Sequence, residues 1–324
     1  MHNAAIKNRV PYKLVKFGDE WLCYWLNTFG EPFSEPFFSE TILKCRGLAY
    51  SRHLPSSVSD MAMMKEWSAD LAFIEPAAFI FHISRCGSTL VAQLLASMKE
   101  HIVLSEVPFF DDLLGLTHKT GITETDTSAL FAAALKFYGQ VRTGVESRLF
   151  VKTDSWHLFY YSQLRRLYPL VPFVFIYRRP GEVFQSLKKK PGMQAVPGLI
   201  APDLLGFDPG EVGYERADIY IAHVLERYLQ RCIEIAATDK LSLFLNYAEG
   251  ALEMVKKIGA FTGASFTRQD LLTMEERVCY DAKNPGEQFS EAELVPAPVF
   301  LDKALALYQS LEGMRMTSKA AEYF

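Results

Sequence analysis

The stretch FIFHISRCGSTLVAQLL, residues 79–95, decides the fold of this 324-residue chain. It opens with an apolar run without polar alternation, which is typical of a strand buried on both faces, and continues into a short turn that contains Gly87. A helical pattern follows, with its apolar positions in one stripe: Leu90, Val91, Leu94, Leu95 and Met98. Such a strand–turn–helix aims backbone N–H groups and the positive end of a helix at one point, which suits a phosphate or a sulfate.

The turn differs from the phosphate-binding loop of nucleotide-hydrolysing enzymes. That loop reads GxxxxGK[ST], and alignment on Gly87 puts His82 at the first glycine and Ser88 at the lysine. The lysine that normally reaches the β- and γ-phosphates is therefore missing, and Arg85 supplies a cation at a different place. Gly87 allows a close approach of the backbone to a ligand, and Ser88 and Thr89 add hydroxyl donors.

Further apolar runs and helical patterns alternate along the chain. Four runs predict buried strands: Ile102–Leu104, Leu149–Val151, Phe173–Tyr177 and Leu241–Leu245. Three helical patterns separate or follow them: ALFAAALKFY behind the N-cap Ser128, Trp156–Tyr168 and Ala217–Ala236. The alternation predicts an α/β fold, a three-layer sandwich in which helices cover a mostly parallel central sheet.

Two segments stand apart from this pattern. Residues 1–75 are rich in aromatic side chains, and FGDEWLCYWLNTFG within them predicts a β-hairpin. We expect residues 1–75 to be an N-terminal extension packed on a main domain of residues 76–324; its aromatic side chains form either a packed layer or a wall for a substrate. Residues 190–216 carry many Pro and Gly residues and predict a long loop, which either covers a substrate or is a solvated insertion.

Composition narrows the class of protein. The 34 basic and 38 acidic residues give a formal net charge of −4, which argues against a nucleic-acid-binding protein. No apolar run approaches the roughly 20 residues of a membrane span, and the start of the chain lacks the apolar block of a signal peptide. The five cysteines are scattered without CxxC spacing, which favours a reducing compartment. We therefore expect a cytoplasmic protein.

A second cluster of polar residues follows the predicted strand Phe173–Tyr177. That strand leads directly to Arg178, and Ser186 lies eight residues further on, inside the next predicted helix. The carboxyl ends of parallel strands are where ligands bind in such sheets. A guanidinium group recognises a phosphate through two parallel hydrogen bonds, so the cluster predicts an anion site.

The two clusters together resemble the sulfotransferases that use 3′-phosphoadenosine 5′-phosphosulfate (PAPS). SRCGSTL resembles their PRSGSTL or PKSGTTW loop, and RRPGEVFQS resembles their RDPxxxxxS motif, with Arg179 where Asp is usual. LFLNYAEGALEMVKKIGAFTG, residues 243–263, resembles a later segment that begins YEDL. In motif style the chain is most similar to bacterial and tyrosyl-protein sulfotransferases. The resemblance implies the P-loop nucleoside-triphosphate-hydrolase-like fold of that family.

The resemblance also implies a cofactor site. PAPS would be the donor and 3′-phosphoadenosine 5′-phosphate (PAP) the product, with no metal required. The turn would hold the 5′-phosphosulfate through Arg85, Cys86, Gly87, Ser88 and Thr89. Among these, Arg85 takes the place of the family's catalytic lysine or arginine. Arg178 and Ser186 would bind the 3′-phosphate. Tyr247 would approach the adenine, and Lys283, in a late basic loop, would add a phosphate contact.

The implied reaction transfers a sulfuryl group to a hydroxyl or amine of a small-molecule or peptide acceptor, and a hydroxyl needs a base. Glu106 in VLSEVPFF resembles the basic glutamate of bacterial and tyrosyl-protein sulfotransferases, and we expect it beside the loop of the first strand. The alternative is Asp154 or His157, near the place where cytosolic enzymes carry KTH. A P-loop kinase or NTPase, or a non-catalytic nucleotide-binding protein of the same fold, are the alternative functions.

Overall fold

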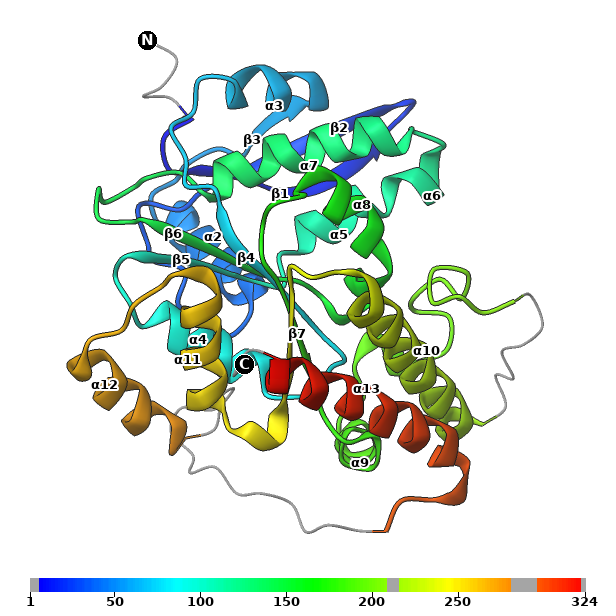
Figure 1. Cartoon of the computed structure of the whole chain (residues 1–324). Helices are drawn as coiled ribbons and strands as arrows, with labels where there is room; N and C mark the ends of the chain where they lie inside the picture. The colour runs from blue at the N-terminus through cyan, green and yellow to red at the C-terminus, as the bar shows by residue number, and fades with distance from the viewer. Residues whose placement is uncertain (1–5, 209–215, 281–295, 322–324) are drawn as a thin grey trace. The chain divides into compact units, whose positions relative to one another are not determined.

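The computed structural model describes residues 6–208, 216–280 and 296–321, and this part of the chain contains two β-sheets. The smaller sheet is antiparallel, in the order β1 (Arg9–Phe17), β2 (Glu20–Asn27) and β3 (Ser57–Asp60). The larger sheet has the order β5 (His101–Ser105), β6 (Arg148–Lys152), β4 (Pro76–His82), β7 (Phe173–Tyr177) and β8 (Ser242–Asn246) (Figure 1). Its strands are parallel and flanked by helices, so the predicted α/β class is confirmed.

The strands of the larger sheet are buried as their apolar runs predict. β7 has the predicted bounds and all five of its residues are buried. The ring of Phe175 stacks on Phe81 of β4 at 5.1 Å and on Phe244 of β8 at 4.8 Å between centroids. Aromatic and β-branched residues fill a sheet that is covered on both faces, which explains why these runs lack polar alternation.

The chain folds as two compact units whose sequence segments alternate. The first unit comprises residues 1–79, 89–153 and 162–171, and the second comprises residues 80–88, 154–161 and 172–324. The boundary passes through β4, between Phe79 and Ile80. The expected division into residues 1–75 and 76–324 stays a prediction.

In the first unit, β1 and β2 form the predicted hairpin, with Gly18 in the left-handed region of the backbone (φ 61°). The ring of Trp25 meets that of Phe137 edge-on at 4.7 Å, and the ring of Phe38 meets that of Tyr138 at 5.3 Å. Trp25 and Phe38 are therefore part of a packed layer, whereas Phe17 is 74% exposed, so both expectations for the aromatic side chains of residues 1–75 stay open. The α-helices that the structure describes in this unit are α2 (Phe38–Ser51), α3 (Met61–Ser68), α4 (Ser88–Ala96, without its first residue), α5 (Pro108–Leu114), α6 (Leu116–Thr120), α7 (Glu124–Tyr138) and α8 (Tyr161–Leu167, without its first residue).

The predicted N-cap Ser128 is wrong. Helix α7 begins four residues earlier, at Glu124, and its N-cap is Thr123, whose hydroxyl accepts a hydrogen bond from the N–H of Asp126 at 3.1 Å. Two acidic residues in the first turn interact favourably with the positive helix end, which favours the earlier start. Ser128 instead lies within the helix, where its hydroxyl accepts a hydrogen bond from Gln163 at 3.1 Å.

The pattern over Trp156–Tyr168 gives two elements in place of one helix. A 3₁₀ helix, η1 (Ser155–Tyr160), is followed by α8, which ends before Pro169 as expected. The predicted loop 190–216 is irregular except for the 3₁₀ turn η2 (Met193–Ala195) and an isolated bridge between Pro197 and Ile200.

In the second unit, α10 (Ala217–Thr238) confirms the predicted helix. The apolar face that the spacing indicates is buried throughout: Ile221, Val224, Leu225, Tyr228, Cys232 and Ile235. Helix α13 (Asp302–Ala321) packs along α10, as Figure 1 shows in red and olive. The other helical elements are α9 (Pro180–Lys189), η3 (Tyr247–Glu249), α11 (Ala251–Thr262), α12 (Arg268–Val278) and η4 (Val299–Leu301). Within the described ranges, no helix is both long and apolar enough to cross a bilayer.

Candidate functional site

The turn between β4 and α4 (Ser88–Ala96) has an uncommon backbone. Ser84, Arg85 and Gly87 all have positive φ, at 69°, 50° and 78°. A non-glycine residue in this region costs on the order of 1–3 kcal/mol and persists only where its surroundings impose it. At Gly87 space is also limiting, because a Cβ there would lie 2.9 Å from Cδ2 of Tyr247. Both φ and this close approach therefore require a glycine at position 87.

His82 and the end of β7 hold this turn. The N–H of Ser84 donates to Nδ1 of the buried His82 at 3.1 Å, and the N–H of Ile83 donates to the carbonyl of Ile176 at 3.2 Å. The thiol of Cys86 donates to the same carbonyl at 3.2 Å. His82 breaks the nucleotide-loop pattern in the sequence, yet here it is the acceptor that fixes the turn. The Cys86 side chain is buried, so any ligand contact by Cys86 is restricted to its main chain.

Arg178 joins the turn to Tyr247, although the three come from distant parts of the sequence. Its Nη1 donates to the carbonyl of Arg85 at 3.4 Å, and its guanidinium carbon lies 3.9 Å from the centre of the Tyr247 ring. Its Nε donates to Glu182 Oε2 at 2.6 Å. The structure thus brings together three of the predicted binding residues, Arg85, Arg178 and Tyr247. They follow the carboxyl ends of β4, β7 and β8.

The guanidinium group of Arg178 has room for an anion. Arginine carries five N–H donors, and two of those of Arg178 make the bonds to Glu182 and Arg85. Across the described residues, the remaining three have no hydrogen-bond partner. The side chain is 17% exposed, so an anion can reach it from solvent. The donor set fits a phosphate group that binds beside the carboxylate of Glu182.

The other predicted cofactor residues have the following places. Ser186 is half-buried on α9, one turn after Glu182 and on the same helix face. Ser88 is buried at the start of α4, and Thr89 follows it. Nη2 of Arg85 donates to the main-chain carbonyl of Lys190, at the C-cap of α9, where the negative helix end attracts a cation. Lys283 lies outside the described residues.

Glu106, the predicted base, belongs to the first unit and is tied to Lys152. Its N–H donates to the Lys152 carbonyl at 2.9 Å, and its carboxylate forms an ion pair with the Lys152 ammonium. The Lys152 side chain is fully buried, whereas that of Glu106 is 20% exposed. Glu106 also has a positive φ of 53°. Lys152 was not among the predicted site residues. Glu106 follows β5, which is separated from β4 by β6. The expectation that Glu106 lies beside the loop of the first strand stays a prediction.

The alternative base residues Asp154 and His157 are more enclosed. Oδ2 of Asp154 lies 3.9 Å from Nε2 of His157, which is too long for a hydrogen bond. The side chains are 12% and 2% exposed, so an acceptor reaches Glu106 more readily than either. The ring of His157 is packed edge-on against Trp156 and Tyr160. The greater exposure of its side chain therefore favours Glu106 over Asp154 and His157 as the base.

Sequence reasoning also missed Glu182, the carboxylate that faces Arg178. The signal was present, because an acid four residues after a base at the start of a helix commonly forms an ion pair with it. Glu182 lies in the first turn of α9, where the helix end favours a negative charge. Its hydrogen bond with Nε of Arg178 fixes the position of that side chain.

Comparison with known proteins finds similarity only among solved structures, since no family model and no curated protein matches the chain. Sulfotransferase STF9 from Mycobacterium avium is 12% identical over 81% of this chain and 80% of its own, with a TM-score of 0.47. A sulfotransferase from Alicyclobacillus acidocaldarius is 17% identical over 75% of this chain and 96% of its own, with a TM-score of 0.38. Mouse SULT7A1 complexed with PAP is 12% identical over 67% of this chain and 68% of its own, with a TM-score of 0.34.

Proposed function

We propose that the chain is a PAPS-dependent sulfotransferase that transfers a sulfuryl group to a hydroxyl or amine acceptor. The observation that carries the proposal is the contact of Arg178 with both the Arg85 carbonyl and the Tyr247 ring. Arg85, Arg178 and Tyr247 belong to three separate motifs of the sequence that match one family, and all three lie in the second unit. The three N–H donors of Arg178 without a partner among the described residues fit the 3′-phosphate that distinguishes PAPS from ordinary nucleotides.

In this proposal the cofactor supplies a sulfuryl group attached to a good leaving phosphate. Arg178 and Ser186 bind the 3′-phosphate, and Tyr247 contacts the adenine. Arg85 and the N–H groups at the start of α4 neutralise the negative charge that develops on the leaving oxygen. Glu106 removes the proton from the acceptor. Positioning and charge neutralisation together provide most of the catalysis in transfers of this kind.

The proposal is tested by comparing PAP with AMP, which lacks the 3′-phosphate. We expect PAP to raise the melting temperature of the protein clearly more than AMP does, because a tighter ligand stabilises the folded state more. Arg178→Ala should weaken PAP binding roughly 10- to 150-fold, the effect of losing hydrogen bonds to a charged group, and should leave AMP binding less affected. Isothermal titration calorimetry measures both affinities.

Arg179→Ala is the matched control, since it removes the same charge from the exposed neighbouring side chain. PAP affinity should stay near the wild-type value in that variant. Equal melting-temperature shifts with PAP and AMP in the wild-type protein would contradict the assignment of the 3′-phosphate to Arg178 and Ser186. Turnover of Mg-ATP would favour the kinase alternative instead.

The support that His82 gives the turn allows a further prediction. His82→Leu removes the acceptor for the Ser84 N–H, and we expect PAP binding to weaken roughly 5- to 100-fold, because a buried donor loses its partner in a strained turn. His82→Asn should keep binding within a few-fold of wild type, because its side-chain oxygen can take the place of Nδ1. Calorimetry with PAP measures both variants. Equal affinities of the Leu and Asn variants would show that the acceptor does not matter.

A further inference from the structure

Helix α13 meets the end of β7 through a buried phenol. The hydroxyl of Tyr177, the last residue of β7, donates to the carboxylate of Glu312 on α13. Arg315 then holds that carboxylate with two parallel hydrogen bonds, from Nε to Oε1 at 2.9 Å and from Nη2 to Oε2 at 2.8 Å. Tyr177 itself is fully buried, so its hydroxyl depends on this one helix for an acceptor.

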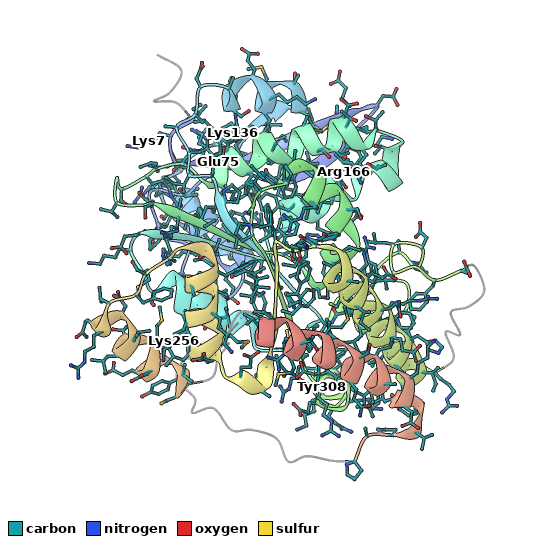
Figure 2. The ribbon with its side chains drawn as sticks, viewed as in Figure 1. Lys7, Glu75, Lys136, Arg166, Lys256 and Tyr308 are labelled. Carbon is teal, nitrogen blue, oxygen red and sulfur yellow. The ribbon has the colours of Figure 1, made fainter. Side chains whose placement is uncertain are left out.

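The same helix also meets the end of β8. Nδ2 of Asn246, the last residue of β8, donates to the hydroxyl of Tyr308 at 2.7 Å. Tyr308 lies on α13, where Figure 2 labels it. Nη1 of Arg315 donates to Oε1 of Glu249 at 3.0 Å. Glu249 accepts in turn from the N–H of Asn246 at 2.9 Å, which closes the capping box of η3.

The protonation states support these directions of donation. Burial acts to raise the pKa of Glu312, but hydrogen bonds from Arg315 and Tyr177 lower that pKa overall, so the group is a carboxylate that accepts. Burial, together with the hydrogen bond to Glu312, raises the pKa of Tyr177 far above its ordinary value, so the phenol keeps its proton and donates. The hydrogen bonds that Tyr177 and Arg315 make to Glu312 therefore have defined directions.

The residues anchored in this way directly precede the two that contact each other in the candidate site. Tyr177 precedes Arg178, and Asn246 precedes Tyr247. A helix that holds both strand ends fixes the distance between the residues that follow them. The 3.9 Å contact between the Arg178 guanidinium and the Tyr247 ring depends on that distance.

We propose that α13 positions the nucleotide site by joining the ends of β7 and β8, so that Arg178 and Tyr247 are stacked before a nucleotide binds. This inference rests on the proposed function, which supplies the nucleotide. Tyr177, Tyr308, Glu312 and Arg315 are positioning residues that act through their neighbours. Preorganisation of this kind strengthens binding, because the ligand does not have to order the two loops.

The test uses the double variant Tyr177→Phe/Tyr308→Phe, which removes only two hydroxyl groups and leaves the Glu312–Arg315 ion pair intact. We expect PAP affinity to fall roughly 3- to 30-fold, the effect of losing two part-buried hydrogen bonds that order the site. The KM for PAPS should rise by a similar factor while kcat changes little. A merely structural role would lower the melting temperature without this split.

Tyr161→Phe is the matched control in the same unit. Its hydroxyl also donates to a carboxylate, Asp239 at 2.8 Å, but its ring packs on Phe173 at the start of β7, away from the candidate site. We expect this variant to be destabilised by the loss of one hydrogen bond, against two in the double variant, and to bind PAP as wild type does. PAP affinity that falls as far in Tyr161→Phe as in the double variant would overturn the proposal.

Hydrogen exchange separates a failure of this inference from a failure of the proposed function, because it needs no ligand. Amides in residues 178–182 and 247–250 should exchange faster in the double variant than in wild type or in Tyr161→Phe. Unchanged exchange in both segments would overturn the positioning role, whatever PAP does. Faster exchange in a protein that shows no preference for PAP over AMP would support the positioning role and contradict the proposed function.

Discussion

Glu106→Gln is expected to lower turnover by about 10²–10⁴-fold while PAP still binds, because an amide cannot accept the proton of the acceptor hydroxyl. The acceptor for this measurement comes from a screen with sulfur-labelled PAPS, and the kcat of the variant is compared with that of wild type. Calorimetry with PAP shows whether the cofactor site is intact. Undiminished turnover would remove Glu106 from the reaction.

The ion pair with Lys152 requires a control for stability. Glu106→Gln leaves a fully buried ammonium group without its counter-charge, and loss of one partner of a buried pair costs about 3–5 kcal/mol. The double variant Glu106→Gln/Lys152→Met removes both charges and should recover much of the lost stability. It should remain as inactive as the single variant. If turnover recovers together with stability in this double variant, the role of Glu106 is only to neutralise the charge of Lys152.

The alternative base is tested in parallel. Asp154→Asn and His157→Asn change groups that are more enclosed than Glu106, and we expect each to reduce turnover far less than Glu106→Gln does. The ratio of kcat between each variant and wild type is the measurement. A loss of 10²-fold or more in either variant, with Glu106→Gln near wild type, would assign the base to that pair.

Arg85→Ala is expected to lower kcat by about 10²–10³-fold, the usual effect of removing one preorganised donor that stabilises developing charge. Arg85→Lys should recover part of this loss, since it keeps the cation but not the planar fork. PAP affinity should fall less than kcat, because the charge on the leaving oxygen is greatest in the transition state. Single-turnover kinetics with labelled PAPS measures the step directly.

The control for Arg85 is again Arg179→Ala, an exposed arginine outside the candidate site. Its kcat should stay near the wild-type value. A loss of PAP affinity in Arg85→Ala that equals the loss of kcat/KM would leave Arg85 with a binding role alone. The carbonyl of Lys190 accepts a hydrogen bond from Arg85 in this structure. It is a main-chain group, so the substitutions at Arg85 and Arg179 leave it unchanged.

The parts of the fold that depend on local pattern could be predicted from the sequence. The bounds of β7, the hairpin of β1 and β2 and the buried face of α10 all follow from periodicity and turn residues. The start of α7 could not be predicted in this way, because Thr123 and Ser128 are both hydroxyl residues that precede an apolar pattern. Only the acidic first turn distinguishes them.

The parts that depend on sheet order could not be predicted. Parallel strands joined by helices can be ordered in several ways, so nothing in the sequence places β6 between β4 and β5. The ion pair of Glu106 with Lys152 follows from that order. The anion site at Arg178 follows from its position after a buried strand, and the role of Tyr247 follows from the resemblance. The contact between them depends on the tertiary fold and could not be predicted. The anchoring helix α13 lies beyond the segment that the resemblance covers.

The contacts of α13 also bear on how the second unit acquires its structure during synthesis. The hydrogen bond between Tyr177 and Glu312 spans 135 residues, and that between Glu249 and Arg315 spans 66. A ribosome that adds about 5–20 residues per second needs about 3–13 s to make the second of these intervals. Through that time β7 and β8 exist without the helix that joins their ends. The nascent chain therefore carries Arg178 and Tyr247 for seconds before Arg315 can help to hold them together.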